Sequence, residues 1–129
     1  MPNAALLLHI LPSGPPHFDW LLPHNASPPD QPLITFRISR LPTDLPPGVP
    51  IQATRIHDHR PRYLEFEGPL SDNRGTVRRL ASPRVEMLEE TPDDLRFTAD
   101  WGDGTRTYRA RFTPEAGPDR WLITREPTP

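Results

Sequence analysis

The chain has 129 residues, a formal net charge of −2 and no cysteine. This length suits a single domain, the lack of cysteine excludes disulfides and thiolate metal sites, and the charge argues against a generally basic nucleic-acid binder. The N-terminus has no charged segment, and the apolar run over residues 4–8 is too short for a signal peptide or a membrane span. We therefore expect a cytoplasmic, monomeric protein with no membrane partner.

Strands are predicted along most of the chain, because apolar and polar residues alternate with a period of two. Proline provides 20 residues, and these cluster between the apolar runs, where they would separate strands rather than interrupt them. In chain order the expected strands are Ala5–Leu11, His17–Leu22, Leu33–Ile38, Ile51–His57, Tyr63–Glu67, Gly75–Leu80, Arg84–Leu88, Leu95–Trp101, Thr105–Phe112 and Trp121–Arg125.

The connections between these strands carry their own signals. The sequence WGDGTR, from Trp101 to Arg106, is typical of a tight hairpin, because its two glycines can adopt positive φ. No window keeps helical spacing over the length that a helix needs, so a single turn near Pro92–Leu95 is the only helix expected.

These features predict an all-β fold, namely a single-domain, compact antiparallel β-barrel with little helix. The barrel would span residues 1–126, and residues 127–129 would form a frayed tail. Side chains expected in its core are those of Phe18, Trp20, Phe36, Leu64, Phe66, Phe97 and Trp101.

The first stretch with possible chemistry is LHILPSGPPHFDWLL, from Leu8 to Leu22. On a strand, residues two apart share a face, so His17 and Asp19 point to the same side. If the turn is centred on Ser13, His9 lies opposite His17 with the Cβ atoms roughly 5 Å apart. Two imidazoles and a carboxylate suit Mn²⁺, Fe²⁺ or Zn²⁺ and leave coordination positions open. The alternative is a solvated polar strand face.

The second stretch is RIHDHRPRYLEFEG, from Arg55 to Gly68. Strand alternation predicts that Arg55, His57 and His59 share one face, with Asp58 on the other. A histidine flanked by arginines beside a metal suits phosphate chemistry, in which charge builds up on the non-bridging oxygens. The alternative is a basic loop with ordinary surface histidines.

Together, the two stretches resemble the 3′-phosphoesterase domain of the bacterial end-joining DNA ligase D, and most closely its short stand-alone relatives. In that family a strand ending in His, then His-aromatic-Asp, binds Mn²⁺, and the matching residues here are His9, His17 and Asp19. The resemblance covers roughly residues 6–125. It implies a metal-dependent phosphoesterase that acts on 3′ ends of nucleic acid in DNA end processing, beside a DNA ligase or another end-joining factor.

The second family motif is Asp-His, a Tyr four residues after the His, an acidic residue and Glu-Gly. It is matched here by Asp58, His59, Tyr63, Glu67 and Gly68. In the family the His contacts the scissile phosphate, so the resemblance assigns that role to His59 and adds Tyr63 to the catalytic residues.

The chain also departs from the family pattern. The family has Arg, Glu and Arg where this chain has Leu21, Pro23 and Ile51. Arg55 would lie on the same strand face as Ile51, so we expect it to replace the missing clamp, unless it pairs with Glu65 instead. The losses favour a second hypothesis, a non-catalytic nucleic-acid or phosphate-binding module of the same fold. A non-haem iron oxygenase is the third, because HFD followed by a distant His imitates its facial triad.

Overall fold

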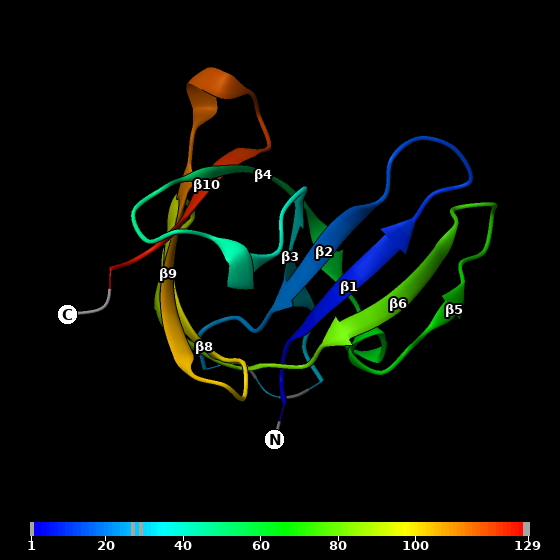
Figure 1. Cartoon of the computed structure of the whole chain (residues 1–129), viewed down its shortest axis with the longest axis horizontal. Coiled ribbons are helices and arrows are strands. Elements are labelled where there is room, and N and C mark those ends of the chain that lie inside the picture. Colours follow the sequence, from blue (N-terminus) through cyan, green and yellow to red (C-terminus); the bar gives the residue numbers. More distant parts are fainter. Residues whose placement is uncertain (1, 27, 29, 128–129) are drawn as a thin grey trace.

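A computed structural model describes the chain except for residues 1, 27, 29 and 128–129, so most of the expected tail lies outside the described residues. Within that part, regular structure consists of ten strands and three short 3₁₀ helices (Figure 1). The strands are β1 Ala5–Ile10, β2 His17–Leu22, β3 Leu33–Ile38, β4 Ile51–His59, β5 Gly68–Pro69, β6 Thr76–Ala81, β7 Arg84–Glu90, β8 Asp94–Asp100, β9 Thr105–Phe112 and β10 Arg120–Arg125. The 3₁₀ helices are η1 Pro42–Asp44, η2 Pro61–Leu64 and η3 Pro114–Ala116. The all-β prediction is confirmed.

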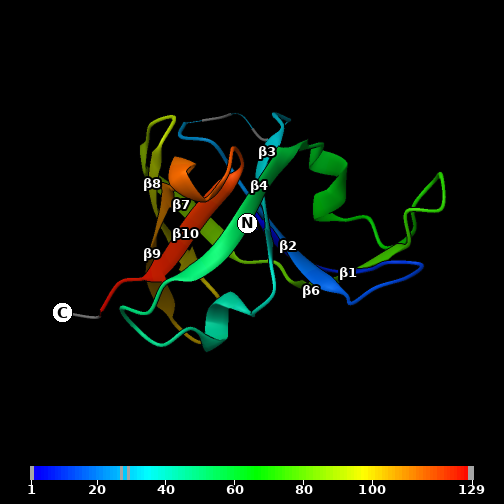
Figure 2. The same cartoon turned by 90° about the horizontal axis from the view of Figure 1, so that it is seen from above.

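The strands form one antiparallel sheet in the order β5-β6-β1-β2-β3-β4-β10-β9-β8-β7. Figures 1 and 2 show this sheet strongly curled, with β1 and β6 on the opposite side of the molecule from β8 and β9. The predicted barrel differs from this arrangement in one respect. Among the described residues, β5 and β7 remain at the two ends of the order, so backbone pairing does not close the sheet.

The main core lies on the concave face of the curl. The largest of its fully buried side chains are Trp20, Tyr108, Phe36 and Phe97. The Trp20 ring meets Tyr108 and Phe97 edge-on, with centroid distances of 5.0 and 5.2 Å. Such aromatic pairs add to the stabilisation that burial provides. The predicted core positions of Trp20, Phe36 and Phe97 are confirmed, and Phe18 and Trp101 pack against this core while partly exposed.

A smaller apolar cluster occupies the other face of β1, β2 and β3. Ala5, Leu7, Leu21 and Leu33 form it, and η2 covers them through two side chains, Tyr63 and Leu64. The predicted strand over Tyr63–Glu67 is wrong, because Pro61 begins the 3₁₀ helix that folds across this face. Leu64 therefore packs on this second cluster and not in the main core. Phe66 is also not in the main core, and its half-buried ring lies under the guanidinium of Arg62.

The helical turn expected near Pro92–Leu95 is also wrong. The backbone N–H of Thr91 donates a hydrogen bond to the carbonyl of Asp94, and β8 begins directly at Asp94. This segment is therefore a hairpin connection between β7 and β8. No helix in the described part of the chain is long and apolar enough to cross a membrane.

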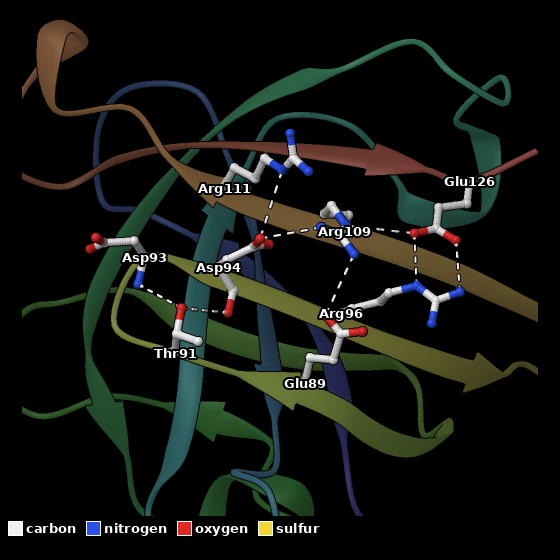
Figure 3. A network of polar contacts seen from close by, with 8 residues as sticks. All are labelled: Glu89, Thr91, Asp93, Asp94, Arg96, Arg109, Arg111 and Glu126. Carbon is white, nitrogen blue, oxygen red and sulfur yellow. Dashed lines mark hydrogen bonds and ion pairs between the residues drawn. The ribbon is translucent and has the colours of Figure 1, made fainter.

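Charged side chains cover the far half of the sheet, over β7, β8 and β9 (Figure 3). Arg96 makes a two-pronged contact with Glu126, and Arg109 contacts Glu89, Asp94 and Glu126 at 3.6, 3.2 and 3.7 Å. Exposed ion pairs of this kind contribute little individually. Because these guanidiniums already have carboxylate partners, this network is best understood as a solvated structural surface.

Candidate metal centre

The β1–β2 hairpin brings two histidines and an aspartate together. His9 pairs with His17 across the hairpin, and Leu7 pairs with Asp19, so the predicted register is confirmed. His9 and Asp19 are buried, with exposed fractions of 7 % and 2 %. The alternative of a solvated polar strand face is therefore wrong, because buried polar groups need partners.

The three side chains face one another, and one ligand atom from each lies within 4.8 Å of the other two. His9 Nδ1 lies 3.0 Å from His17 Nε2 and 3.4 Å from Asp19 Oδ2, and His17 Nε2 lies 3.3 Å from Asp19 Oδ1. Ligand atoms about 2.1 Å from one cation, and at right angles to each other, lie about 3 Å apart. The two imidazoles are 3.0 Å apart, and each lies beside a different oxygen of the Asp19 carboxylate, so the three side chains could hold one divalent cation.

A backbone carbonyl fixes the protonation of His9. Its Nε2 lies 2.7 Å from the carbonyl oxygen of Arg74, which can only accept a hydrogen bond. Nε2 therefore carries the proton, and Nδ1 turns its lone pair toward His17 and Asp19. A second contact of this type is the usual support for a metal-binding imidazole.

The environment also favours neutral His17. Burial lowers the pKa of the His17 imidazole below its ordinary value, although the nearby Asp19 carboxylate opposes this shift. A neutral imidazole is the form that ligates a metal. Two imidazole nitrogens only 3.0 Å apart need either one shared proton or one cation between them.

Arg37 is a component of this site that sequence reasoning missed. It pairs directly with Asp19 across β2 and β3, and its Nε lies 3.4 Å from Asp19 Oδ1. The Arg37 side chain is 40 % exposed, whereas the Asp19 side chain is 3 % exposed. The only signal in the sequence was a single charged residue inside the apolar run LITFRI.

A β-bulge in β4 brings His59 to the same face. Leu33 pairs with His59 and Thr35 with Ile56, so three steps on β4 correspond to two on β3. The extra residue turns His59 to the side of Leu33, where its ring lies 5.5 Å from that of Tyr63.

His59 is half-buried, and its Nδ1 donates a hydrogen bond to the carbonyl of His57. Burial lowers the pKa of His59, with Asp19 opposing the shift and Arg37 adding to it. The charges of Asp19 and Arg37, at the candidate metal centre, therefore affect the pKa of His59.

The same bulge separates Arg55 from this group, and the predicted face shared by Arg55 and His59 is wrong. Arg55 pairs with the core residue Phe36, and its guanidinium lies 5.2 Å from the ring centroid of Trp121. It lines a surface cavity of about 440 Å³ on the side of the sheet opposite Asp19. Among the described residues, Arg55 forms no ion pair with Glu65, the alternative partner.

Two positions at which the chain departs from the pattern of the family it resembles are buried in apolar clusters. Leu21 is fully buried in the second apolar cluster, and Ile51 belongs to the main core, so neither position offers a polar group to the site.

The sequence matches no family model and none of the curated proteins in the comparison. Functional interpretation therefore rests on the motifs and on the geometry.

Proposed function

We propose that this protein is a metal-dependent phosphoesterase that acts on 3′ ends of nucleic acid, with Mn²⁺ as its cation. One observation supports this most strongly: one ligand atom each from His9, His17 and Asp19 lie within 4.8 Å of one another, with His59 and Arg37 on the same face. A bound divalent cation would supply Lewis acidity and an activated water molecule there.

The chain's own residues would divide the remaining work. His9 and His17 present lone pairs, and the Arg74 carbonyl holds the proton of His9 on the atom that faces away from the site. His59 donates its Nδ1 proton in a hydrogen bond to the His57 carbonyl, which leaves Nε2 to accept a proton and, once protonated, to donate a hydrogen bond to a phosphate oxygen. Tyr63 packs beside His59, so its role is to position that ring and to offer its hydroxyl to the substrate.

A second candidate function is a non-catalytic module that binds phosphate or nucleic acid. The observation in its favour is the apolar character of Leu21 and Ile51, which are buried where the family has arginines. The non-haem iron oxygenase hypothesis takes His17, Asp19 and a later histidine as ligands, whereas the histidine beside His17 and Asp19 is His9, which precedes them in the chain. It also gives no role to cationic and imidazole groups on the same face. Phosphate chemistry gives a role to both Arg37 and His59, so we favour it.

Several broader expectations belong to the same proposal. We infer that the curled sheet works as a barrel whose opening is bridged by side chains, since the Asn3 amide exchanges two hydrogen bonds with the Val85 backbone of β7. We further propose a monomeric, cytoplasmic protein whose partners are nucleic-acid 3′ ends and a DNA ligase or another end-joining factor.

The decisive experiment combines Mn²⁺ titration calorimetry with release of phosphate from a 3′-phosphorylated oligonucleotide. Asp19→Asn removes the charged ligand, so we expect Mn²⁺ affinity to fall on the order of a hundredfold and phosphate release to be lost. His17→Gln, at a less buried ligand, should give the same pattern. Asp58→Asn is the control, because the Asp58 carboxylate lies 2.6 Å from His24 and away from the ligands.

The outcomes separate the candidates. Mn²⁺ binding by the wild type that is unchanged in Asp19→Asn would place the site elsewhere and overturn the proposal. Binding of Mn²⁺ and of the oligonucleotide without phosphate release would favour the binding module. Oxygen consumption by the Fe²⁺-loaded protein would favour the oxygenase.

A further inference from the structure

Arg37 is the one charged residue of β3, whose sequence is LITFRI. Its neighbours on the same face, Leu33 and Thr35, are buried, and its partner across the ladder is the buried Asp19. A charged side chain in such a strand needs a compensating interaction. The 3.4 Å contact between Arg37 Nε and Asp19 Oδ1 is long for a charged hydrogen bond, so it satisfies this need only in part.

The outer end of the Arg37 guanidinium is available. Its Nε faces Asp19, while Nη1 and Nη2 form no hydrogen bond within the described part of the chain, and the side chain is 40 % exposed. Arg96 and Arg109 differ in this respect, since carboxylates already occupy their guanidiniums. Two parallel N–H donors in a planar fork match two oxygens of a phosphate group.

The charges around the centre also call for an anion. A divalent cation held by two neutral imidazoles and one carboxylate, the forms that ligate a metal, would have a net charge of about +1. Arg37 raises this to about +2, which a phosphate monoester balances because it carries about −1.5 to −2 at neutral pH. Without an anion, the positive charges of Arg37 and of the cation would be balanced only by the Asp19 carboxylate.

We propose that Arg37 binds the non-bridging oxygens of the 3′-terminal phosphate and thereby supplies the clamp that Leu21 and Ile51 cannot provide. This inference rests on the proposed function and names the residue that confers affinity for its phosphate. Arg55 is not suited to the role, because its guanidinium lies over Trp121 on the opposite face.

The test measures binding of inorganic phosphate to the Mn²⁺-loaded protein by calorimetry, alongside Mn²⁺ binding itself. Arg37→Gln should weaken phosphate binding at least tenfold, and Arg37→Lys should recover only part of the loss, because an ammonium group has no planar fork. Mn²⁺ affinity of Arg37→Gln should stay equal to that of the wild type or rise a few-fold, since a repelling charge is removed. Arg55→Gln is the matched control and should bind both Mn²⁺ and phosphate as the wild type does.

Three results would overturn the inference, and they differ in what they say about the proposed function. If Arg37→Gln binds phosphate as well as the wild type, the inference fails and the proposed function stands. If Arg37→Gln loses Mn²⁺ affinity as strongly as phosphate affinity, Arg37 only positions Asp19. If the wild type binds Mn²⁺ without phosphate, or no Mn²⁺ at all, the inference and the proposed function fail together.

Discussion

His9 and His17 have different supports, although both point a ring nitrogen at the same place. His9 is buried, and the Arg74 carbonyl holds its outer nitrogen at 2.7 Å. His17 is half-buried, and the recorded polar contacts of its ring are with His9 and Asp19 themselves. His9 is therefore the prearranged member of the pair, whereas His17 depends on its two partners for orientation.

His59 should matter for turnover and little for metal binding. Replacing it by Gln removes an imidazole that neither ligates the cation nor forms part of the core, so His59→Gln should lower 3′-phosphate release by about 10²–10³-fold. Mn²⁺ affinity and the urea midpoint should stay near those of the wild type. His57→Gln is the control, because this exposed ring lies 5.1 Å from His59 and, among the described residues, makes no ring contact with Tyr63. Equal turnover by the two variants would remove His59 from the mechanism.

The sequence predicts that His9, His17 and Asp19 meet, because these residues are close in the chain. His9, His17 and Asp19 lie on two strands joined by a short turn, so a two-residue period and one assumed turn centre suffice to align them. Arg37 was not predictable in this way. It reaches Asp19 across the β2–β3 pair, whose ten-residue connection does not fix the register between the strands.

At the scale of elements, β4 shows where the simple alternation rule fails. Regular pairing would place Arg55 and His59 on one face, but the extra residue between Ile56 and His59 sends them to opposite faces. The sequence RIHDHR contains no glycine that would predict this bulge, so its position depends on pairing with the partner strand.

The helix η2 was missed for a related reason. The alternation in YLEFE suggested a strand, although the Arg60–Pro61 pair before it signals a break.

The β5–β6 turn supports the candidate metal centre, because its Arg74 carbonyl lies 2.7 Å from His9 Nε2. Gly75 has φ +90°, and a Cβ there would overlap the Ile10 carbonyl oxygen. Gly75→Ala should therefore destabilise the protein by about 3 kcal/mol, combining left-handed strain with a backbone clash. Because the displaced peptide includes the Arg74 carbonyl that holds His9, Mn²⁺ affinity should fall as well.

Gly14 offers a matched control for this prediction. It has φ +86°, but a Cβ there would meet no atom within 4 Å. Gly14→Ala should cost only about 1 kcal/mol of left-handed strain and leave Mn²⁺ binding unchanged. Urea denaturation and calorimetry of both variants provide the comparison. Equal losses in the two proteins would show that the contact between Gly75 and Ile10 has no special role.

At the scale of the whole molecule, side-chain hydrogen bonds connect β7, at one end of the sheet order, to other parts of the chain. The Asn3 amide donates to and accepts from the backbone of Val85, which is buried. Further along β7, His24 lies between Glu90 and Asp58 of β4, 2.6 Å from each carboxylate. The backbone N–H of Asn25 adds a hydrogen bond of 2.7 Å to Glu90. The connection after β2 is thus tied to two strands that are far apart in the sheet.

The His24 bridge should make stability depend on pH. Burial disfavours the charged imidazole, but hydrogen bonds to Asp58 and Glu90 outweigh it and raise the pKa of His24 above its ordinary value of 6.5. A pKa raised by folding means that the bridge contributes its full stabilisation below about pH 6.5 and loses it as the pH rises through the folded-state pKa. His24→Gln should therefore lower the free energy of unfolding by about 1 kcal/mol at pH 6 and by much less at pH 9. The value is small because the side chains are partly exposed.

Urea denaturation at the two pH values measures this difference. Asp58→Asn should reproduce it in part, because one of the two carboxylate partners of His24 remains. A His24→Gln loss that is the same at pH 6 and pH 9 would mean that the imidazole is neutral in the folded protein and that the bridge acts without its charge.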